Sequence, residues 1–296
     1  MNIVLLRREE LSSGCFVFQR TDERFRHIKN VLKLGVGSVF KAGIIGGEKG
    51  TAEITAFSGE RLTARFTAAE QSAADERAVP FFRIRLILGF PRPIQLRRIL
   101  RDVAGLGIEA LYLTGTELGE KSYLQSDIAA EDTVRRLLID GCSQAGETDI
   151  PQVHRAHSLR DFFDRYEAAM PSQQLRAVLD VPAAMTSSVP AARSGLSGTE
   201  YRSRMTPHEG EQLAAVQSVI RPITALRWDG RHPLWLAVGN ERGWSRNERI
   251  LFVEKRFSAY SMGSRILRTE TAVTSAIAAC LALSGAWDQG KSGIMG

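Results

Sequence analysis

Short runs of apolar and β-branched residues, bounded by turn residues, fill the first 75 residues of the chain. Between the second and third runs, His27–Leu34 carries apolar residues at helical spacing and stops at Gly35. Several short strands with one small helix predict a compact β-barrel over residues 1–75. The runs expected to form its strands are Ile3–Leu6, Cys15–Phe18, Ser38–Ala42, Thr51–Ile54 and Arg61–Phe66.

The pattern changes after Gln71–Arg77, a polar and aperiodic stretch that we interpret as a linker. Beyond it, apolar strands alternate with helical periodicity, which predicts a parallel α/β domain over residues 78–296. The expected strands are Phe82–Gly89, Glu109–Leu113, Leu175–Val181, Leu234–Val238 and Ser258–Met262. The expected helices are Ile94–Leu106, Glu131–Ala145, Leu159–Ala168, Arg246–Phe257 and Thr271–Ser284.

One stretch, Pro182–Glu211, interrupts this alternation. It is rich in Ser, Gly, Pro, Ala and Arg and has no periodicity. A structureless loop of this length inside a domain is usually mobile or functional. We interpret residues 182–211 as a disordered insertion, and contact between its arginines and phosphate is the alternative.

Charge and composition narrow the function classes. The chain carries 39 basic and 33 acidic residues, a formal charge of +6, and 32 of the basic residues are arginine. Arginine recognises phosphate through planar, paired hydrogen bonds, so this bias is compatible with nucleic acid; a GC-rich genome explains it equally well. No apolar run approaches the roughly 18–20 residues of a membrane span, and the apolar run at the start is too short for a signal peptide.

Cysteine and histidine usage excludes two further kinds of site. Three widely separated cysteines form neither a disulfide framework nor a CxxC zinc motif, and they fit a reducing cytoplasm. The five histidines include no i, i+4 pair. His154–His157 is interpreted as a surface loop, and no metal site is expected.

Two segments near the carboxyl end have the same design of strand, glycine loop and helix. In Leu234–Glu248 a buried strand ends in a glycine-rich loop, and Ser245 with Glu248 forms a capping box for the next helix. In Tyr260–Ala272 the loop carries arginines, a carboxylate and threonines. Ligands of parallel sheets bind beyond the carboxyl ends of the strands, so two such loops predict a pocket suited to a purine edge and a charged tail. The alternative is that Thr269 or Thr271 only caps the last helix, with Glu270 complementing its dipole.

These segments also resemble a known family. Met262–Ala272 (MGSRILRTETA) closely resembles the LGxRILRTETA signature of the RsmE-type 16S rRNA uridine N3-methyltransferases, and Val238–Ser245 (VGNERGWS) is similar to their (I/V)GPEGG(F/W)S loop. His27–Gly37 is similar to their HhxxVLRhxxG segment. A weaker similarity, which includes Leu106–Ile108 and Ser143–Gly146, extends over nearly the whole chain.

The resemblance implies a two-domain enzyme. Residues 1–75 would form a PUA-like β-barrel that binds RNA, and residues 78–296 a SPOUT α/β domain that binds S-adenosyl-L-methionine in a C-terminal trefoil knot. The family acts as a cytoplasmic homodimer, without metal or membrane, on uridine N3 in 16S rRNA of the small ribosomal subunit. A SPOUT methyltransferase with another RNA target and a non-catalytic RNA-binding relative remain alternatives.

The resemblance also implies the site residues. Arg265 and Arg268 would stabilise charge on the oxygens of the deprotonated uracil, with Arg268 the favoured catalytic residue. Glu270 would act as the base or hold an arginine in place. Residues expected at the cofactor are Leu179, Val238, Gly239, Asn240, Glu241, Gly243, Met262, Gly263, Ile266, Leu267 and Thr271, and residues expected at RNA are Arg24, Arg26, Lys29, Arg92, Arg97 and Arg98.

Four positions depart from the family pattern. Asn240 and Arg242 replace the proline and the first paired glycine of GPEGG, and a side chain at Arg242 is expected to crowd the loop if that glycine has positive φ. Leu118 and Glu147 stand where the family has arginines. We expect the arginines of the first helix of the α/β domain, including Arg101, to compensate for them.

Overall fold

The computed structural model describes residues 2–69, 81–171, 173–181 and 220–287. The chain divides into two compact units. The first unit contains residues 1–81, 100–107 and 131–151, and the second contains residues 82–99, 108–130 and 152–296. The expected linker, residues 71–77, and the expected insertion near 182–211 lie outside the described residues.

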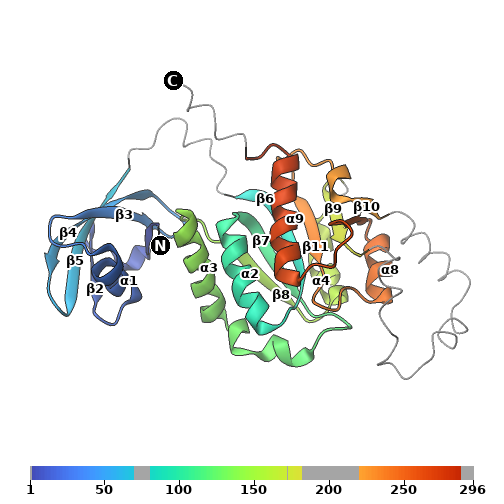
Figure 1. The fold of residues 1–296 in the computed structure, drawn as a ribbon, viewed down its shortest axis with the longest axis horizontal. Helices are drawn as coiled ribbons and strands as arrows, with labels where there is room; N and C mark the ends of the chain where they lie inside the picture. The colour runs from blue at the N-terminus through green and yellow to red at the C-terminus, as the bar shows by residue number, and fades with distance from the viewer. Residues whose placement is uncertain (1, 70–80, 172, 182–219, 288–296) are drawn as a thin grey trace, which may run out of the picture. The chain divides into compact units, whose positions relative to one another are not determined.

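The first unit is built on a five-stranded sheet in the order β1-β3-β4-β5-β2. Only the β1–β3 pair is parallel. The strands are β1 (Val4–Leu6), β2 (Cys15–Gln19), β3 (Val39–Ile44), β4 (Lys49–Phe57) and β5 (Arg61–Ala68). The sheet curls around its core (Figure 1), yet among the described strands no pairing joins β1 to β2. The expected barrel is therefore an open half-barrel.

A short helix covers the inner face of this sheet. Helix α1 (Glu23–His27) begins earlier than the sequence predicted, because the Asp22 side chain accepts a hydrogen bond from the Arg24 N–H and caps it. A π-helical turn, Ile28–Leu32, continues it. Phe25 and Ile28 are fully buried and pack in the core with aromatic residues of β2 and β3. A 3₁₀ turn, Arg8–Glu10, follows β1.

Arg24 joins these pieces of the first unit. Its guanidinium contacts Glu10 at 2.7 Å, Asp22 at 2.8 Å and the Leu5 carbonyl at 2.9 Å, and it lies 4.1 Å from the centre of the Phe18 ring. Burial alone would raise the pKa of Glu10 and of Asp22, but hydrogen bonds and charge from Arg24 outweigh it and lower both pKa values. The arginine expected at RNA is thus held by two carboxylates.

Helix α3 (Glu131–Ala145) belongs to the first unit. The Ser143 carbonyl accepts hydrogen bonds from the N–H groups of Asn2 (2.9 Å) and Ile3 (3.2 Å). A Cβ at Gly141 would lie 2.3 Å from the Arg101 carbonyl oxygen, so this glycine lets the end of helix α2 approach α3. Glu147, where the family has an arginine, forms a 2.5 Å ion pair with Lys49 of β4.

The second unit is a seven-stranded sheet in the order β10-β12-β9-β11-β6-β7-β8, and every pair in it is parallel. The strands are β6 (Phe82–Gly89), β7 (Ile108–Thr114), β8 (Gln152–Ala156), β9 (Leu175–Leu179), β10 (Arg221–Pro222), β11 (Leu234–Val238) and β12 (Ser258–Ser261). The predicted α/β class is confirmed. His154 lies in edge strand β8, so interpreting His154–His157 as a loop was wrong; an edge strand needs less apolar sequence.

Helices cover both faces of this sheet. The helices are α2 (Pro93–Gly105), α4 (Leu159–Tyr166), α8 (Arg246–Glu254) and α9 (Thr269–Leu283). Figure 1 shows α9 in front of the strands and α4 behind them. On the α4 side, Trp235, Trp244, Phe162 and Phe252 form the aromatic centre of one core cluster. No helix in the described part of the chain is long and apolar enough to cross a membrane.

The order of the strands in this sheet determines which loops can meet at its edge. Strand β11 lies between β9 and β6, and β9 also pairs with β12. Because these strands are parallel, the segments that follow β9, β11 and β12 leave the sheet at the same edge. The two glycine loops singled out in the sequence therefore leave the same edge of the sheet, on either side of the segment that follows β9.

Replacing Arg24 with Gln is expected to lower the free energy of unfolding of the first unit by about 2–4 kcal/mol near neutral pH, because two half-buried carboxylates lose their cation. Glu10 and Asp22 have folded-state pKa values below the ordinary 4.5 and 3.8. Their contribution is present above the ordinary values and is lost as pH falls through the lower folded-state values, so the effect of R24Q should shrink at acidic pH. Denaturant unfolding followed by circular dichroism at both pH values measures this.

Arg20→Gln is the matched control. It breaks an exposed 2.7 Å ion pair with Glu60, for which the expected loss is less than about 1 kcal/mol. Equal losses in R20Q and R24Q would contradict the structural role of Arg24.

Candidate functional site

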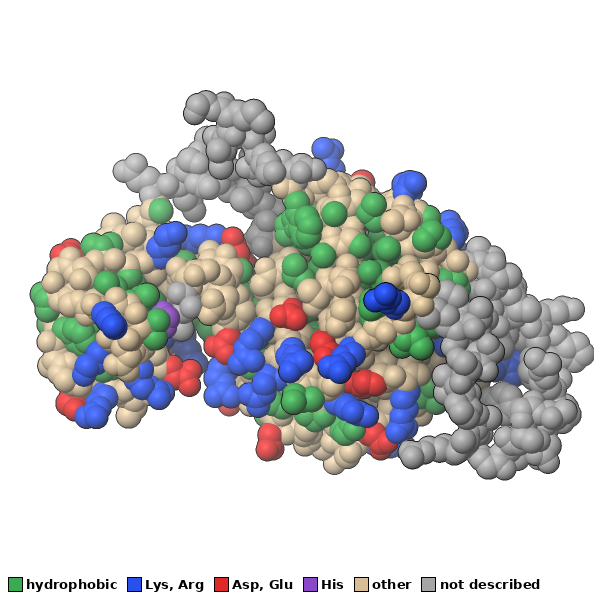
Figure 2. Space-filling view, in the orientation of Figure 1, with side chains coloured by type: hydrophobic (Ala, Val, Ile, Leu, Met, Phe, Trp, Pro, Cys, Tyr) green, Lys and Arg blue, Asp and Glu red, His purple; other side chains and the backbone are tan. Residues whose placement is uncertain are grey.

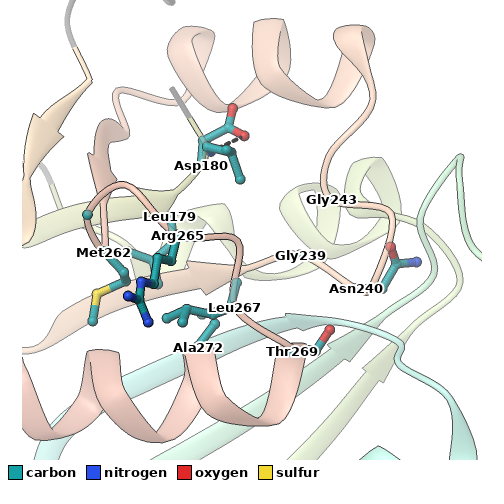
Figure 3. A pocket seen from close by; sticks show the side chains of 13 residues that line it. Leu179, Asp180, Gly239, Asn240, Gly243, Met262, Arg265, Leu267, Thr269 and Ala272 are labelled. Carbon is teal, nitrogen blue, oxygen red and sulfur yellow. Dashed lines mark hydrogen bonds between the residues drawn. The ribbon is translucent and has the colours of Figure 1, made fainter. Parts of the chain in front are cut away.

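A pocket opens at the carboxyl ends of β9, β11 and β12 (Figure 3), and we call it the strand-end pocket. The segment after β9, the loops after β11 and β12, and the first turn of α9 each supply part of its wall. The lining residues are Leu179, Asp180, Val181, Val238, Gly239, Asn240, Gly243, Met262, Gly263, Arg265, Leu267, Thr269 and Ala272. Eight of the residues expected at a cofactor are among them.

In the loop after β11, two stretches of backbone approach each other closely. A Cβ at Gly239 would lie 3.0 Å from the backbone of Gly243, so a larger residue would push the two segments apart. Gly243 has φ +69° and its N–H donates to the Asn240 carbonyl at 2.9 Å, which closes a tight turn. The turn presents bare backbone to the pocket.

The family departures at positions 240 and 242 brace this turn. The Asn240 side chain accepts from the Arg242 N–H at 2.9 Å and donates to the Thr116 hydroxyl at 2.8 Å. Arg242 is not among the lining residues, and its guanidinium donates to the Leu118 carbonyl and to the Glu120 carboxylate, at 3.1 and 2.9 Å. It is not among the residues with positive φ. The crowding that we expected at Arg242 is therefore absent.

Helix α8 fixes the far end of the same loop. The Ser245 hydroxyl accepts from the Glu248 N–H at 3.1 Å, and the Glu248 carboxylate accepts from the Ser245 N–H at 2.8 Å, so the predicted capping box is present. Glu248 also accepts from the Glu117 N–H at 3.0 Å. Burial raises the pKa of the Glu248 carboxyl, although these N–H donors oppose the shift.

Three residues expected at the cofactor lie outside the pocket lining. The Glu241 carboxylate accepts from the Arg92 N–H at 3.0 Å. Ile266 is 65% exposed, and Thr271 is exposed on α9. On a helix, Thr269 and Ala272 share one side and Thr271 faces another, which explains why the pocket takes the first two.

Four lining residues were not among the site residues predicted from the sequence: Asp180, Val181, Thr269 and Ala272. Asp180 is the most distinctive, because its side chain is only 10% exposed and forms an ion pair with Arg249 of α8. Its position directly after β9 was the available signal, since ligands bind beyond the carboxyl ends of strands. The partner, 69 residues away, left no local pattern.

The candidate catalytic residues occupy three different settings. Arg265 lines the pocket and is exposed. Arg268 is the exposed N-cap residue of α9 and its side chain makes no capping bond, so α9 starts without the threonine cap considered as an alternative. Glu270 is buried: one carboxylate oxygen lies 3.6 Å from Arg98, and the other has no hydrogen-bond partner among the residues that the structure describes.

Basic side chains gather over α2 on the face shown in Figure 2. Arg92, Arg97 and Arg98 are exposed there. Arg101, which lies in the part of α2 that belongs to the first unit, pairs with Asp140 of α3 in the same unit at 3.2 Å. In α1 and the turn after it, Arg26 and Lys29 are exposed, in contrast to the paired Arg24.

Comparison with protein families matches both parts of the chain. Residues 77–281 match the family described as RNA methyltransferase domain, and residues 21–67 match the RNA methyltransferase PUA domain. Among curated proteins, the chain is 41% identical to the ribosomal RNA small subunit methyltransferase E of Treponema pallidum, over 97% of this chain and 93% of that protein. It is 25% identical to ribosomal RNA small subunit methyltransferase E 1 of Borreliella burgdorferi, over 93% and 95% of the two chains.

Solved structures share the fold over the full length. A ribosomal RNA small subunit methyltransferase E from Neisseria gonorrhoeae, bound to S-adenosyl methionine, superposes with a TM-score of 0.66 at 22% identity, covering 96% of this chain and 98% of that one. A probable rRNA-methyltransferase from Porphyromonas gingivalis gives a TM-score of 0.67 at 16% identity, covering 97% and 100%. The 41% identity to the Treponema protein and the match over residues 77–281 show that the chain belongs to the ribosomal RNA small subunit methyltransferase E family.

Proposed function

We propose that this protein transfers a methyl group from S-adenosylmethionine to N3 of a uridine in 16S rRNA of the small ribosomal subunit. The observation that carries this proposal is the strand-end pocket, because most of its lining comes from the two segments that resemble the family signature. The Treponema relative is named for the small-subunit RNA, and the Neisseria structure contains the cofactor.

The residues of the pocket fit such a cofactor. Leu179, Leu267 and Ala272 offer an apolar wall for an adenine ring, and the bare backbone at Gly239 and Gly243 offers N–H and C=O groups to its edge. Arg265 provides a cation for the carboxylate of the methionine part. Bound there, the cofactor supplies an activated methyl group.

The chain must position the uracil and handle the proton at N3. When N3 loses its proton, negative charge spreads to the ring oxygens, and an arginine at the pocket mouth stabilises it. We assign this role to Arg268, with Arg265 beside it, because both are exposed next to the pocket. Glu270 is buried and contacts Arg98 of α2, so we assign it a positioning role that it exerts through Arg98.

RNA contact, in this proposal, involves the basic side chains of both units. The exposed Arg26 and Lys29 serve the PUA-like domain of residues 1–75, and the exposed arginines 92, 97 and 98 on α2 serve the methyltransferase domain of residues 78–296. Arg24 keeps a structural role, because its guanidinium is already bonded to two carboxylates.

The proposal includes a trefoil knot at the carboxyl end and a homodimer that acts in the cytoplasm. The end of α9 and the turn after it support a dimer, because the apolar side chains of Leu283 and Trp287 are 43% and 48% exposed there. Figure 2 shows apolar side chains gathered over this helix. Sedimentation of the purified protein as a monomer at micromolar concentration would contradict the dimer.

The function is tested with purified protein, labelled S-adenosylmethionine and small ribosomal subunits from a strain that lacks the gene. We expect N3-methyluridine to form in the small-subunit RNA. Subunits from the parent strain are the control, because their site is already modified and should accept little label. Label in another nucleoside would contradict the assigned target. The absence of label from every nucleoside would contradict the proposed methyltransferase activity.

Gly239→Ala is expected to weaken S-adenosylmethionine binding about tenfold or more, because the added Cβ lies 3.0 Å from the Gly243 backbone and displaces the loop. Titration calorimetry measures the affinity. Gly59→Ala is the control, since a Cβ there has nothing within 4 Å. Unchanged affinity in G239A would show that the turn does not contact the cofactor.

Arg268→Ala is expected to reduce the rate of methyl transfer about a hundredfold or more, and to leave cofactor affinity within a few-fold. The reason is that Arg268 lies beside the pocket without lining it. Single-turnover assays on small subunits and calorimetry separate the two effects, with Arg160→Ala of α4, also exposed, as control. Activity equal to that of R160A would make Arg268 dispensable.

A further inference from the structure

Asp180 is the single carboxylate among the described residues that line the strand-end pocket. It follows the last residue of β9, and Figure 3 shows it on the wall opposite Thr269 and Ala272. Its side chain is 10% exposed, which is unusual for an ionised group, and its N–H donates to the Tyr260 carbonyl of β12 at 2.9 Å. Both its backbone and its side chain are therefore held in place.

The hydrogen bonds of this carboxylate leave one position open. A carboxylate offers about four acceptor positions. At Asp180, Oδ1 accepts from the Val181 N–H at 2.8 Å and from Nη2 of Arg249 at 3.0 Å, and Oδ2 accepts from Nε of Arg249 at 2.5 Å. Counting donors in the described part of the chain, Oδ2 thus has room for one more donor.

Arg249 determines what kind of donor suits that position. The fork of two hydrogen bonds neutralises the charge of Asp180 and fixes its orientation. A neutralised carboxylate is a good acceptor for a neutral donor and a poor counter-ion for an ammonium or sulfonium group. The backbone of the loop at Gly239 already serves the purine edge, so the remaining neutral donors of the cofactor are its ribose hydroxyls.

We propose that Asp180, oriented by Arg249, accepts a hydrogen bond from a ribose hydroxyl of the cofactor and so recognises its nucleoside part. This inference rests on the proposed function. The geometry behind it is a buried acceptor at the carboxyl end of a parallel strand, a place where carboxylates bind ribose hydroxyls in other α/β folds. Arg249 is a positioning residue, since it reaches the pocket through Asp180.

Two variants test the contact. Asp180→Ala removes the acceptor and leaves Arg249 unpaired, and D180A with R249M removes both charges, which avoids a half-buried unpaired arginine. Both should bind S-adenosylmethionine and S-adenosylhomocysteine about tenfold more weakly than the unmodified protein, by the same factor for the two ligands. Calorimetry gives the affinities, and thermal unfolding without ligand shows that the variants fold.

Analogues of S-adenosylhomocysteine that lack one ribose hydroxyl locate the donor. Loss of the hydroxyl that meets Asp180 should cost about tenfold on the unmodified protein and less than about twofold on the double variant. Glu167→Gln is the matched control, because it breaks the 2.6 Å pair with Lys255 at the other end of α8, away from the pocket. E167Q should bind every ligand normally.

Three results would overturn the proposal. The first is that the double variant binds both ligands with normal affinity. The second is that removing the hydroxyl lowers affinity by the same factor in the unmodified protein and in the double variant. The third is a loss confined to S-adenosylmethionine, which would place Asp180 at the sulfonium. Failure of the unmodified protein to bind either ligand would contradict the proposed function itself, which keeps the two tests distinct.

Discussion

The site depends on one close approach, that of the backbone at Gly239 to the backbone at Gly243. This contact, with the left-handed turn at Gly243, folds the loop after β11 back on itself and exposes main-chain groups beside an apolar wall. The capping box at Ser245 and Glu248 then anchors the loop to α8, and Glu248 ties α8 to the segment after β7. The pocket is thus held from several strands of the sheet, which suits a site that must position a reacting methyl group to within a fraction of an ångström.

The departures from the family pattern occur in compensating groups. Asn240 lacks the rigidity of proline, but its amide bonds to Thr116 and to the Arg242 N–H restrain the same turn. Arg242 adds a side chain where the family has none, and that side chain extends to Glu120 and to the carbonyl of Leu118, the position where the family's arginine is missing. Both side chains therefore hold the loop after β11 against the segment after β7.

Local pattern predicted most of the fold and part of the site. Apolar runs revealed the buried strands, and glycine turns at matching strand ends revealed the pocket, because both signals lie within a few residues of each other. Long-range partners carry no such signal. Arg24 was expected at RNA, since no local pattern shows that Glu10, 14 residues away, shares its guanidinium with the neighbouring Asp22. Asp180 was overlooked because its importance comes from Arg249, and edge strand β8 was overlooked because few of its residues are apolar.

The position of helix α3 affects any attempt to cut the chain into separate domains at one point of the sequence. Its Ser143 carbonyl takes its hydrogen bonds from the N–H groups of Asn2 and Ile3, and its hydroxyl donates to the Ile3 carbonyl. A truncated protein that begins after the curled sheet would keep the helix but lose these partners, leaving polar backbone and apolar surface uncovered. Each unit is therefore formed by several separate stretches of the chain. A catalytic fragment made by deleting the residues before β6 would expose surface that these stretches normally cover.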